Sequence, residues 1–247
     1  MDNEYLAYYQ TQLKHQSEHG DPRLLTMDVM GRRQPWDRCL DCLKEGRIAP
    51  ADREQHAVKK HFAWAVPNDD ALAAVAKHSP NGVVEIGAGG GYWAGMLRAC
   101  GVDVVAYDPA PPKDGPTKWH SKPGGWSDVD RGDHRTAARH PGRTLLLVWP
   151  SCEEAWAGEA VRRYHKSGGD TVIYVGEGPG GCTGDDTLHR LLGADDGYCT
   201  HHLFTSEDCD CVTRVEPLFS ELDDVTIPQW FGIHDHLTVY RRMPDWT

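Results

Sequence analysis

The sequence lacks any apolar run that approaches the ~20 residues of a membrane-spanning helix. Its first residues, MDNEYLAYYQ, also lack the basic start and apolar middle of a secretory signal peptide. We therefore expect a cytoplasmic protein with no membrane partner. Basic residues are scarce too, because 26 Lys and Arg face 37 Asp and Glu, for a formal net charge of −11. Phosphate backbones bind basic surfaces, so this charge disfavours a nucleic-acid partner.

The sequence also gives only weak evidence for a metal-binding site. The chain has eight cysteines, and the short pairs Cys39/Cys42 and Cys209/Cys211 could together form a tetrahedral zinc site. The two pairs lie far apart in the sequence, however, which is not the spacing of a zinc finger. Cys39 and Cys42 would also face each other on a helix without any metal. We see no arrangement of carboxylates that indicates a site for a divalent cation, and we expect no metal.

One stretch of the sequence organises the rest of the chain. An apolar run at residues 83–86 is followed by a glycine-rich loop at residues 87–91 and a helical pattern to residue 100. A second apolar run, residues 102–107, ends in Asp108. This order of strand, tight turn, helix and strand is typical of a nucleoside-binding βαβ unit. Glycines let the backbone approach a ligand closely, and the acid can accept hydrogen bonds from ribose hydroxyls.

The spacing of the glycines separates two ligand classes. A dinucleotide fold requires G-x-G-x-x-G, and Tyr92 occupies the position of the third glycine. The chain instead has E-x-G-x-G-x-G, starting at Glu85, which resembles motif I of class I S-adenosylmethionine (SAM) methyltransferases. This resemblance implies SAM as cofactor and S-adenosylhomocysteine as product. The cofactor-binding residues that we predict are Glu85, Gly87, Ala88, Gly89, Gly91, Tyr92, Asp108, Asp133 and Trp149. A glycine-rich turn that binds no ligand is the alternative.

The resemblance also implies a fold. We expect an α/β protein with a Rossmann-like, mostly parallel sheet of seven strands in the order 3-2-1-4-5-7-6, with helices on both faces. Residues 1–66 would form an N-terminal helical cap, and residues 67–247 the SAM-binding domain. We expect the third strand at about residues 126–129 and the sixth at residues 212–219. The final strand, residues 237–240, follows without an intervening helix, which fits the antiparallel last strand of this family.

Two further positions follow from the same resemblance. An acid after the third strand commonly binds the adenine amino group, and Asp133 occupies that place, with Asp128 as the alternative if the register differs. An ordinary loop aspartate is the other interpretation. The tip of the fourth strand faces the transferred methyl group, and here it reads Trp149-Pro150-Ser151. Amino-group methyltransferases of DNA bases have an acid or Asn followed by Pro-Pro-Tyr, so this departure argues against base methylation by that mechanism.

Candidates for a general base lie late in the chain. A hydroxyl acceptor usually benefits from a base, most often His, whereas an amine needs only positioning. His234 and His236 flank Asp235, which could orient an imidazole. Glu177 ends the fifth strand in a second glycine-rich loop, at the sheet edge where α/β proteins bind ligands. We predict catalytic roles for His234, His236 and Glu177, although fourteen histidines make a chance cluster easy.

These patterns predict a SAM-dependent methyltransferase that acts on an O or N nucleophile of a small molecule or peptide, in specialised metabolism. Three rivals stay open: a nucleotide-cofactor oxidoreductase, a SAM-binding module without catalysis, and a nucleic-acid methyltransferase, whose affinity would fall steeply with salt. The long loop at residues 113–125, with Trp119 and His120, suits a functional site because long loops in compact domains often carry function. Trp64 could pack in the core or border the pocket. The sequence is compatible with a homodimer.

Overall fold

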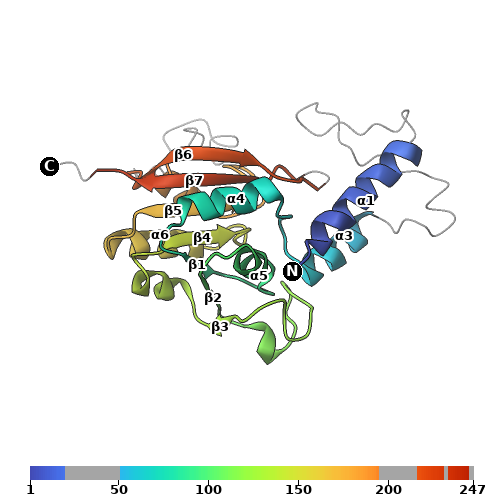
Figure 1. Cartoon of the computed structure of the whole chain (residues 1–247). Coiled ribbons are helices and arrows are strands. Elements are labelled where there is room, and N and C mark those ends of the chain that lie inside the picture. The colour runs from blue at the N-terminus through green and yellow to red at the C-terminus, as the bar shows by residue number, and fades with distance from the viewer. Residues whose placement is uncertain (20–50, 195–215, 231–232, 245–247) are drawn as a thin grey trace.

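A twisted sheet of seven strands forms the centre of the protein (Figure 1). The computed structural model describes residues 1–19, 51–194, 216–230 and 233–244. The strands are β1 (Val83–Ile86), β2 (Val104–Asp108), β3 (Asp130–Arg131), β4 (Thr144–Val148), β5 (Thr171–Gly176), β6 (Phe219–Thr226) and β7 (His236–Arg242). The helices are α1 (Glu4–His19), α3 (Ala51–His61), α4 (Asp69–His78), α5 (Tyr92–Ala99), α6 (Trp156–Lys166) and α7 (Asp186–Leu191), with the short 3-10 helices η2 (Pro112–Asp114) and η3 (His134–Arg139).

The strand order is β3-β2-β1-β4-β5-β7-β6. Strands β1 to β5 pair in parallel, and β7 runs antiparallel to both β5 and β6. This confirms the predicted sheet order and the antiparallel last strand. The central parallel strands β1, β4 and β5 are buried along nearly their whole length because helices cover both of their faces. Their carboxyl ends therefore meet at one edge of the sheet, the place where α/β folds bind ligands.

Two hydrophobic clusters pack on the two faces of the sheet. One cluster joins α4 and α5 to the side chains of one face, including Val83, Leu146 and Ile173. The other joins α6 and α7 to the opposite face, including Val84 and Leu145. Alternation along each strand sends neighbouring residues to opposite faces, so Val83 and Val84 belong to different clusters. The predicted helices on both faces are confirmed.

Helices α1 and α3 lie at one side of the sheet (Figure 1). Tyr5 of α1 is fully buried, and its ring stacks on Phe62 at a centroid distance of 4.8 Å. The Tyr5 hydroxyl also accepts a hydrogen bond of 2.8 Å from the indole of Trp230. A second link runs to α5, where the Tyr92 hydroxyl donates to Asn3 at 3.0 Å and accepts from the Tyr5 backbone N–H at 3.1 Å. The domain boundary at residue 66 stays a prediction.

Two predicted strands were misplaced. The third strand is Asp130–Arg131 rather than residues 126–129. The apolar residues of that predicted segment serve packing instead, because Trp126 stacks on Phe62 and Val129 is buried beneath the glycine loop. The sixth strand is Phe219–Thr226 rather than residues 212–219, and residues 212–215 of the predicted strand lie outside the described part. This edge strand is mostly exposed and acidic, a composition that protects sheet edges but resembles a loop in sequence.

No helix among the described residues is long and apolar enough to cross a membrane. The cysteine pairs Cys39/Cys42 and Cys209/Cys211 lie outside the described residues. Within the described part of the chain, no group of three or more His, Cys, Asp or Glu side chains could hold a metal ion.

Candidate active site

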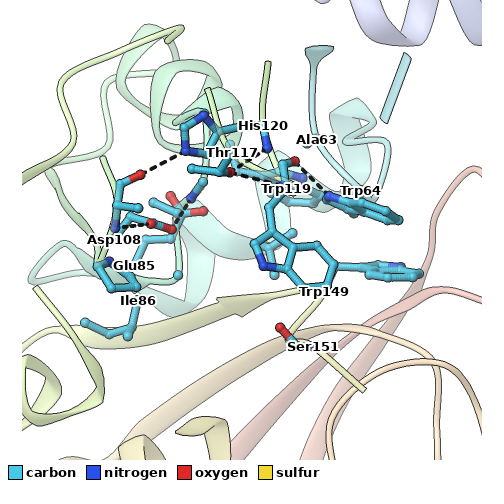
Figure 2. A pocket seen from close by; sticks show the side chains of 18 of the residues that line it. Ala63, Trp64, Glu85, Ile86, Asp108, Thr117, Trp119, His120, Trp149 and Ser151 are labelled. Atoms are coloured by element: carbon cyan, nitrogen blue, oxygen red, sulfur yellow. Dashed lines mark hydrogen bonds between the residues drawn. The ribbon is translucent and has the colours of Figure 1, made fainter. Parts of the chain in front are cut away.

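A pocket of about 470 Å³ lies at the carboxyl ends of β1, β2 and β4. This volume falls within the range of about 300–1,000 Å³ that is usual for small-molecule sites. Figure 2 shows Glu85 and Asp108 on one side of the pocket and Trp64, Trp119 and Trp149 on the other. The pocket thus has an acidic side built by the βαβ unit and an aromatic side built by segments before and after that unit.

The glycines of the loop at residues 87–91 have different structural roles. Gly89 has φ of +53°, and a Cβ added there would meet no atom of the described protein within 4 Å. It lines the pocket, so the missing side chain leaves room for a ligand. A Cβ on Gly87 would lie 2.7 Å from Trp156, and one on Gly91 would lie 2.8 Å from Val129. Gly91 is not a lining residue, and its smallness serves packing of the loop against the protein.

Asp108 ties the glycine loop to the end of β2. Its Oδ2 accepts a hydrogen bond of 2.9 Å from the Gly89 N–H, and its Oδ1 accepts one of 2.8 Å from the Ala110 N–H. A carboxylate oxygen can accept more than one bond, so both atoms keep acceptor capacity for a ligand. Because Asp108 lines the pocket, this capacity is available to hydroxyl donors there.

Glu85 lies in the middle of β1 and is only 1% exposed, yet it lines the pocket. Its Oε2 has no hydrogen-bond partner among the described residues. Burial, and then the nearby Asp108 charge, raise the pKa of Glu85 to about 8, while Arg98 and the Ala94 N–H act in the opposite direction. The side chain is therefore mostly neutral at pH 7. A cation placed against it would favour the ionised form.

The other predicted cofactor residues are placed as follows. Ala88, Tyr92 and Asp133 line the pocket. Asp133 also caps η3 by accepting a hydrogen bond of 2.9 Å from the Arg135 N–H, and this bond holds the pKa of Asp133 below its usual value. The alternative, Asp128, is not a lining residue. The geometry therefore favours Asp133 of the two aspartates.

Trp149 forms part of the aromatic side, in an uncommon backbone conformation. Its φ is +51°, although it precedes Pro150 and the residue before a proline prefers extended backbone. Its indole N–H donates to Asp235 Oδ1 at 2.9 Å, and its ring stacks on Trp64 at a centroid distance of 4.8 Å. Strained residues of this kind persist only where the surroundings over-determine them, and they cluster at functional sites.

Sequence reasoning missed the polar groups behind Trp149. Asp235 is 0% exposed, its Oδ2 has no partner among the described residues, and burial raises its pKa to about 7. Lys59 is 7% exposed, with its Nζ 5.7 Å from the Trp149 ring centroid and 5.9 Å from that of Trp64. Burial lowers the pKa of Lys59, and the charges of Asp235 and Glu177 oppose that shift. No local motif links these residues, because they are distant in the sequence.

His120 is a further lining residue with a defined tautomer. Its Nε2 lies 2.9 Å from the Ala110 carbonyl oxygen, which can only accept, so Nε2 carries the proton. Its Nδ1 is then an acceptor, and this buried atom has no partner within the described residues. The predicted functional role of the loop at residues 113–125 gains support from Thr117, Lys118 and Trp119, which also line the pocket.

The structure does not bring the predicted catalytic residues into the pocket. Glu177 is buried and braces two loops, because it accepts hydrogen bonds of 2.6 Å from the Cys182 N–H and 2.8 Å from the His234 N–H. His236 begins β7 and pairs with Asp224 at 3.1 Å. Neither histidine lines the pocket, and nor does Glu177. Their catalytic roles stay predictions.

Comparison with known proteins gives structural similarity at low sequence identity. No family model matches the sequence, and no curated protein matches it. Magnesium protoporphyrin IX methyltransferase from Synechocystis PCC 6803 with bound SAM is similar at 13% identity and a TM-score of 0.40, over 71% of this chain and 77% of that chain. The 1,6-didemethyltoxoflavin-N1-methyltransferase of Burkholderia thailandensis is similar at 16% identity and a TM-score of 0.40, over 83% of this chain and 85% of that chain.

The fold follows from the sheet itself. Seven strands in the order β3-β2-β1-β4-β5-β7-β6, with β7 antiparallel and helices on both faces, make a Rossmann-like methyltransferase fold. The pocket lies where that fold places its ligands, outside the carboxyl ends of the parallel strands.

Proposed function

We propose that this protein is a SAM-dependent methyltransferase that transfers a methyl group to an oxygen or nitrogen of a small molecule or peptide. The observation that carries the proposal is the Oε2 of Glu85, which has no hydrogen-bond partner in the described part of the chain and is buried at the edge of a pocket that Gly89 leaves open. A buried carboxyl without a partner is costly, and a ligand with a cationic group offsets that cost. A role in specialised metabolism stays a prediction.

The chemical groups of SAM match the residues on the acidic side of the pocket. Its α-ammonium group suits Glu85, its ribose hydroxyls suit the remaining acceptor capacity of Asp108, and its adenine amino group suits Asp133. SAM would supply the activated methyl group on its sulfonium, so the protein need only bind and orient the reactants. The residues present therefore fit this cofactor.

An oxidoreductase with a dinucleotide cofactor fits this pocket less well. A pyrophosphate carries negative charge, and the carboxyl groups of Asp108, Asp133 and Glu154 line the pocket, with Lys118 paired to Glu154. Like charges at close range repel, so the negative charge of the site would weaken the binding of an anionic ligand. A cofactor with a cationic sulfonium and ammonium is favoured by the same charge.

Binding measurements test the proposal. We expect SAM and S-adenosylhomocysteine to bind in isothermal titration calorimetry, and NADH to bind at least tenfold more weakly or not at all. Binding of NADH in preference to SAM would reject the proposed function. A module without catalysis would bind SAM but release no S-adenosylhomocysteine with any acceptor tested.

A matched pair of glycine variants locates the site. Gly89→Ala would place a methyl group in the pocket, whereas Gly101→Ala adds one at the end of α5, where no atom lies within 4 Å. Both glycines have positive φ, +53° and +83°, so the backbone strain is of the same kind. We expect Gly89→Ala to weaken SAM binding at least tenfold and Gly101→Ala to leave the affinity unchanged. Equal affinities in the two variants would overturn the assignment of the glycine loop.

A further inference from the structure

Tryptophan is abundant around the pocket. Five of the nine tryptophans in the chain are lining residues; Trp93 is buried, and the other four are partly exposed. These four come from separate segments: Trp64 follows α3, Trp119 belongs to the loop before β3, Trp149 follows β4 and Trp156 begins α6. A polar ligand would not need so much apolar, polarisable surface, because indole rings bind mainly through their faces and edges.

The geometry of these rings leaves faces and edges for a ligand but few donors. Trp64 and Trp149 are stacked, and Trp119 stands against Trp64 at 70° with a centroid distance of 5.5 Å. The Trp64 indole N–H already donates to the Trp119 carbonyl at 3.0 Å, and that of Trp149 donates to Asp235. Since these two donors are used within the protein, the two rings can recognise a ligand only by stacking and apolar contact.

Contacts within the protein hold the aromatic side in place. The ammonium group of Lys59 lies close to the Trp64 and Trp149 rings, a cation–π arrangement that is stronger when desolvated. Asp235 fixes the orientation of the Trp149 indole, and Pro150 restricts the backbone next to it. Preorganisation of the aromatic side in this way lowers the entropic cost of ligand binding.

Polar groups border the aromatic side at the exposed rim of the pocket. Lys118 and Glu154 are both lining residues, and they form an ion pair of 3.9 Å with side chains that are 73% and 50% exposed. Ser151 lies just below Trp149 in Figure 2. A ligand would therefore meet indole surface along its body and polar groups at one edge.

We propose that this side of the pocket is the methyl-acceptor subsite, and that the acceptor is a planar aromatic molecule with one hydroxyl or amine at its edge. The inference rests on the proposed function. In the reaction, the acceptor oxygen or nitrogen forms a bond to the methyl carbon while the carbon–sulfur bond breaks. The bonding electron pair stays on sulfur, and the acceptor proton leaves to water at the rim.

Two probes that differ only in aromaticity test the subsite. 2-Naphthol and decahydro-2-naphthol share one carbon skeleton and one hydroxyl, but only the first is flat and aromatic. We expect calorimetry to show at least tenfold tighter binding of 2-naphthol, both with and without saturating S-adenosylhomocysteine. Trp119→Leu should remove most of this preference, and Trp119→Phe should restore part of it, because Phe keeps an aromatic ring. Trp126→Leu, outside the lining residues, is the control and should leave the preference intact.

The results separate this inference from the proposed function. Equal affinities for the two probes, no measurable binding of 2-naphthol at millimolar concentration, or a preference that survives Trp119→Leu would each overturn the aromatic subsite. If S-adenosylhomocysteine still binds in that case, the proposed function stands. If the preference is present but neither SAM nor S-adenosylhomocysteine binds, the function fails and the pocket is an aromatic site of another kind.

Discussion

Cofactor binding at pH 7 should release a proton from Glu85. The pKa of this carboxyl is about 8, because it is buried without a partner for Oε2. At pH 7 a group with this pKa holds a proton in about 0.9 of the molecules. An ammonium group brought against it favours the ionised form, so the proton is expelled as the ion pair forms.

The expected amount can be worked out from the usual effect of a neighbouring charge. An opposite charge within hydrogen-bonding range lowers a carboxyl pKa by about 1–3. The pKa of Glu85 would then fall to between about 7 and 5, and the bound form would hold between about 0.5 and 0.01 proton at pH 7. Subtraction from about 0.9 gives a release of roughly 0.4 to 0.9 proton per bound SAM.

Calorimetry at pH 7 in phosphate, MOPS and Tris measures this release, because these buffers differ in their enthalpy of protonation. The slope of the observed binding enthalpy against buffer enthalpy is the number of protons transferred. S-adenosylhomocysteine should give the same slope, since it keeps the ammonium group. 5′-Methylthioadenosine lacks the amino-acid part and should give a slope near zero.

The variant Glu85→Gln isolates the source of the proton. It keeps the size of the side chain but cannot ionise, so the slope should fall to near zero and SAM affinity should weaken. Asp235→Asn is the control, because Asp235 also has a raised pKa but does not line the pocket. A slope near zero in the unmodified protein, or a slope unchanged by Glu85→Gln, would refute the role of Glu85.

Three further predictions follow from the same contacts. In the folded protein, the pKa of Glu85 is about 8 and that of Asp235 is about 7, above their ordinary values of 4.5 and 3.8. The two carboxyl groups therefore contribute fully to the free energy of unfolding below pH about 4, and this contribution is lost as the pH rises to about 8. Urea unfolding at pH 5 and pH 8.5 should show that Glu85→Gln and Asp235→Asn gain most at the higher pH; equal gains at both values would contradict this. Tyr92→Phe removes two hydrogen bonds to the N-terminal segment and should cost about 1–3 kcal/mol in the free energy of unfolding, whereas no change would mean that water replaces them. Asp108→Ala should weaken SAM binding by about 1–3 kcal/mol in calorimetry, and unchanged affinity would remove Asp108 from the site.

The βαβ unit was predictable because its signals are local. Glu85, Gly87, Gly89 and Asp108 lie within one short stretch, and all four line one pocket. The sheet order followed from the family that this stretch resembles. Strand β6 was not predictable in the same way, because it is an acidic edge strand whose pairing with β7 decides its structure.

The neighbours Asp235 and His236 show why the catalytic residues were harder to predict. In sequence they form one polar cluster, yet Asp235 is buried against Trp149 while His236 pairs with Asp224 at the exposed edge. Successive residues of an extended chain point to opposite sides, so adjacent residues can have unrelated environments. The link among Lys59, Trp149 and Asp235 joins three distant segments, and only the folded chain brings them together.

The Tyr92 side chain contacts both the N-terminal segment and the pocket, and this has a thermodynamic consequence for the cofactor site. Its hydroxyl binds Asn3 and the Tyr5 backbone, while its side chain borders the pocket. Docking of α1 and occupation of the pocket are then two events that share one side chain. If docked α1 raises the affinity for the cofactor by some factor, the bound cofactor must favour the docked helix by the same factor. A protease that cuts undocked α1 would therefore act as a reporter of cofactor concentration.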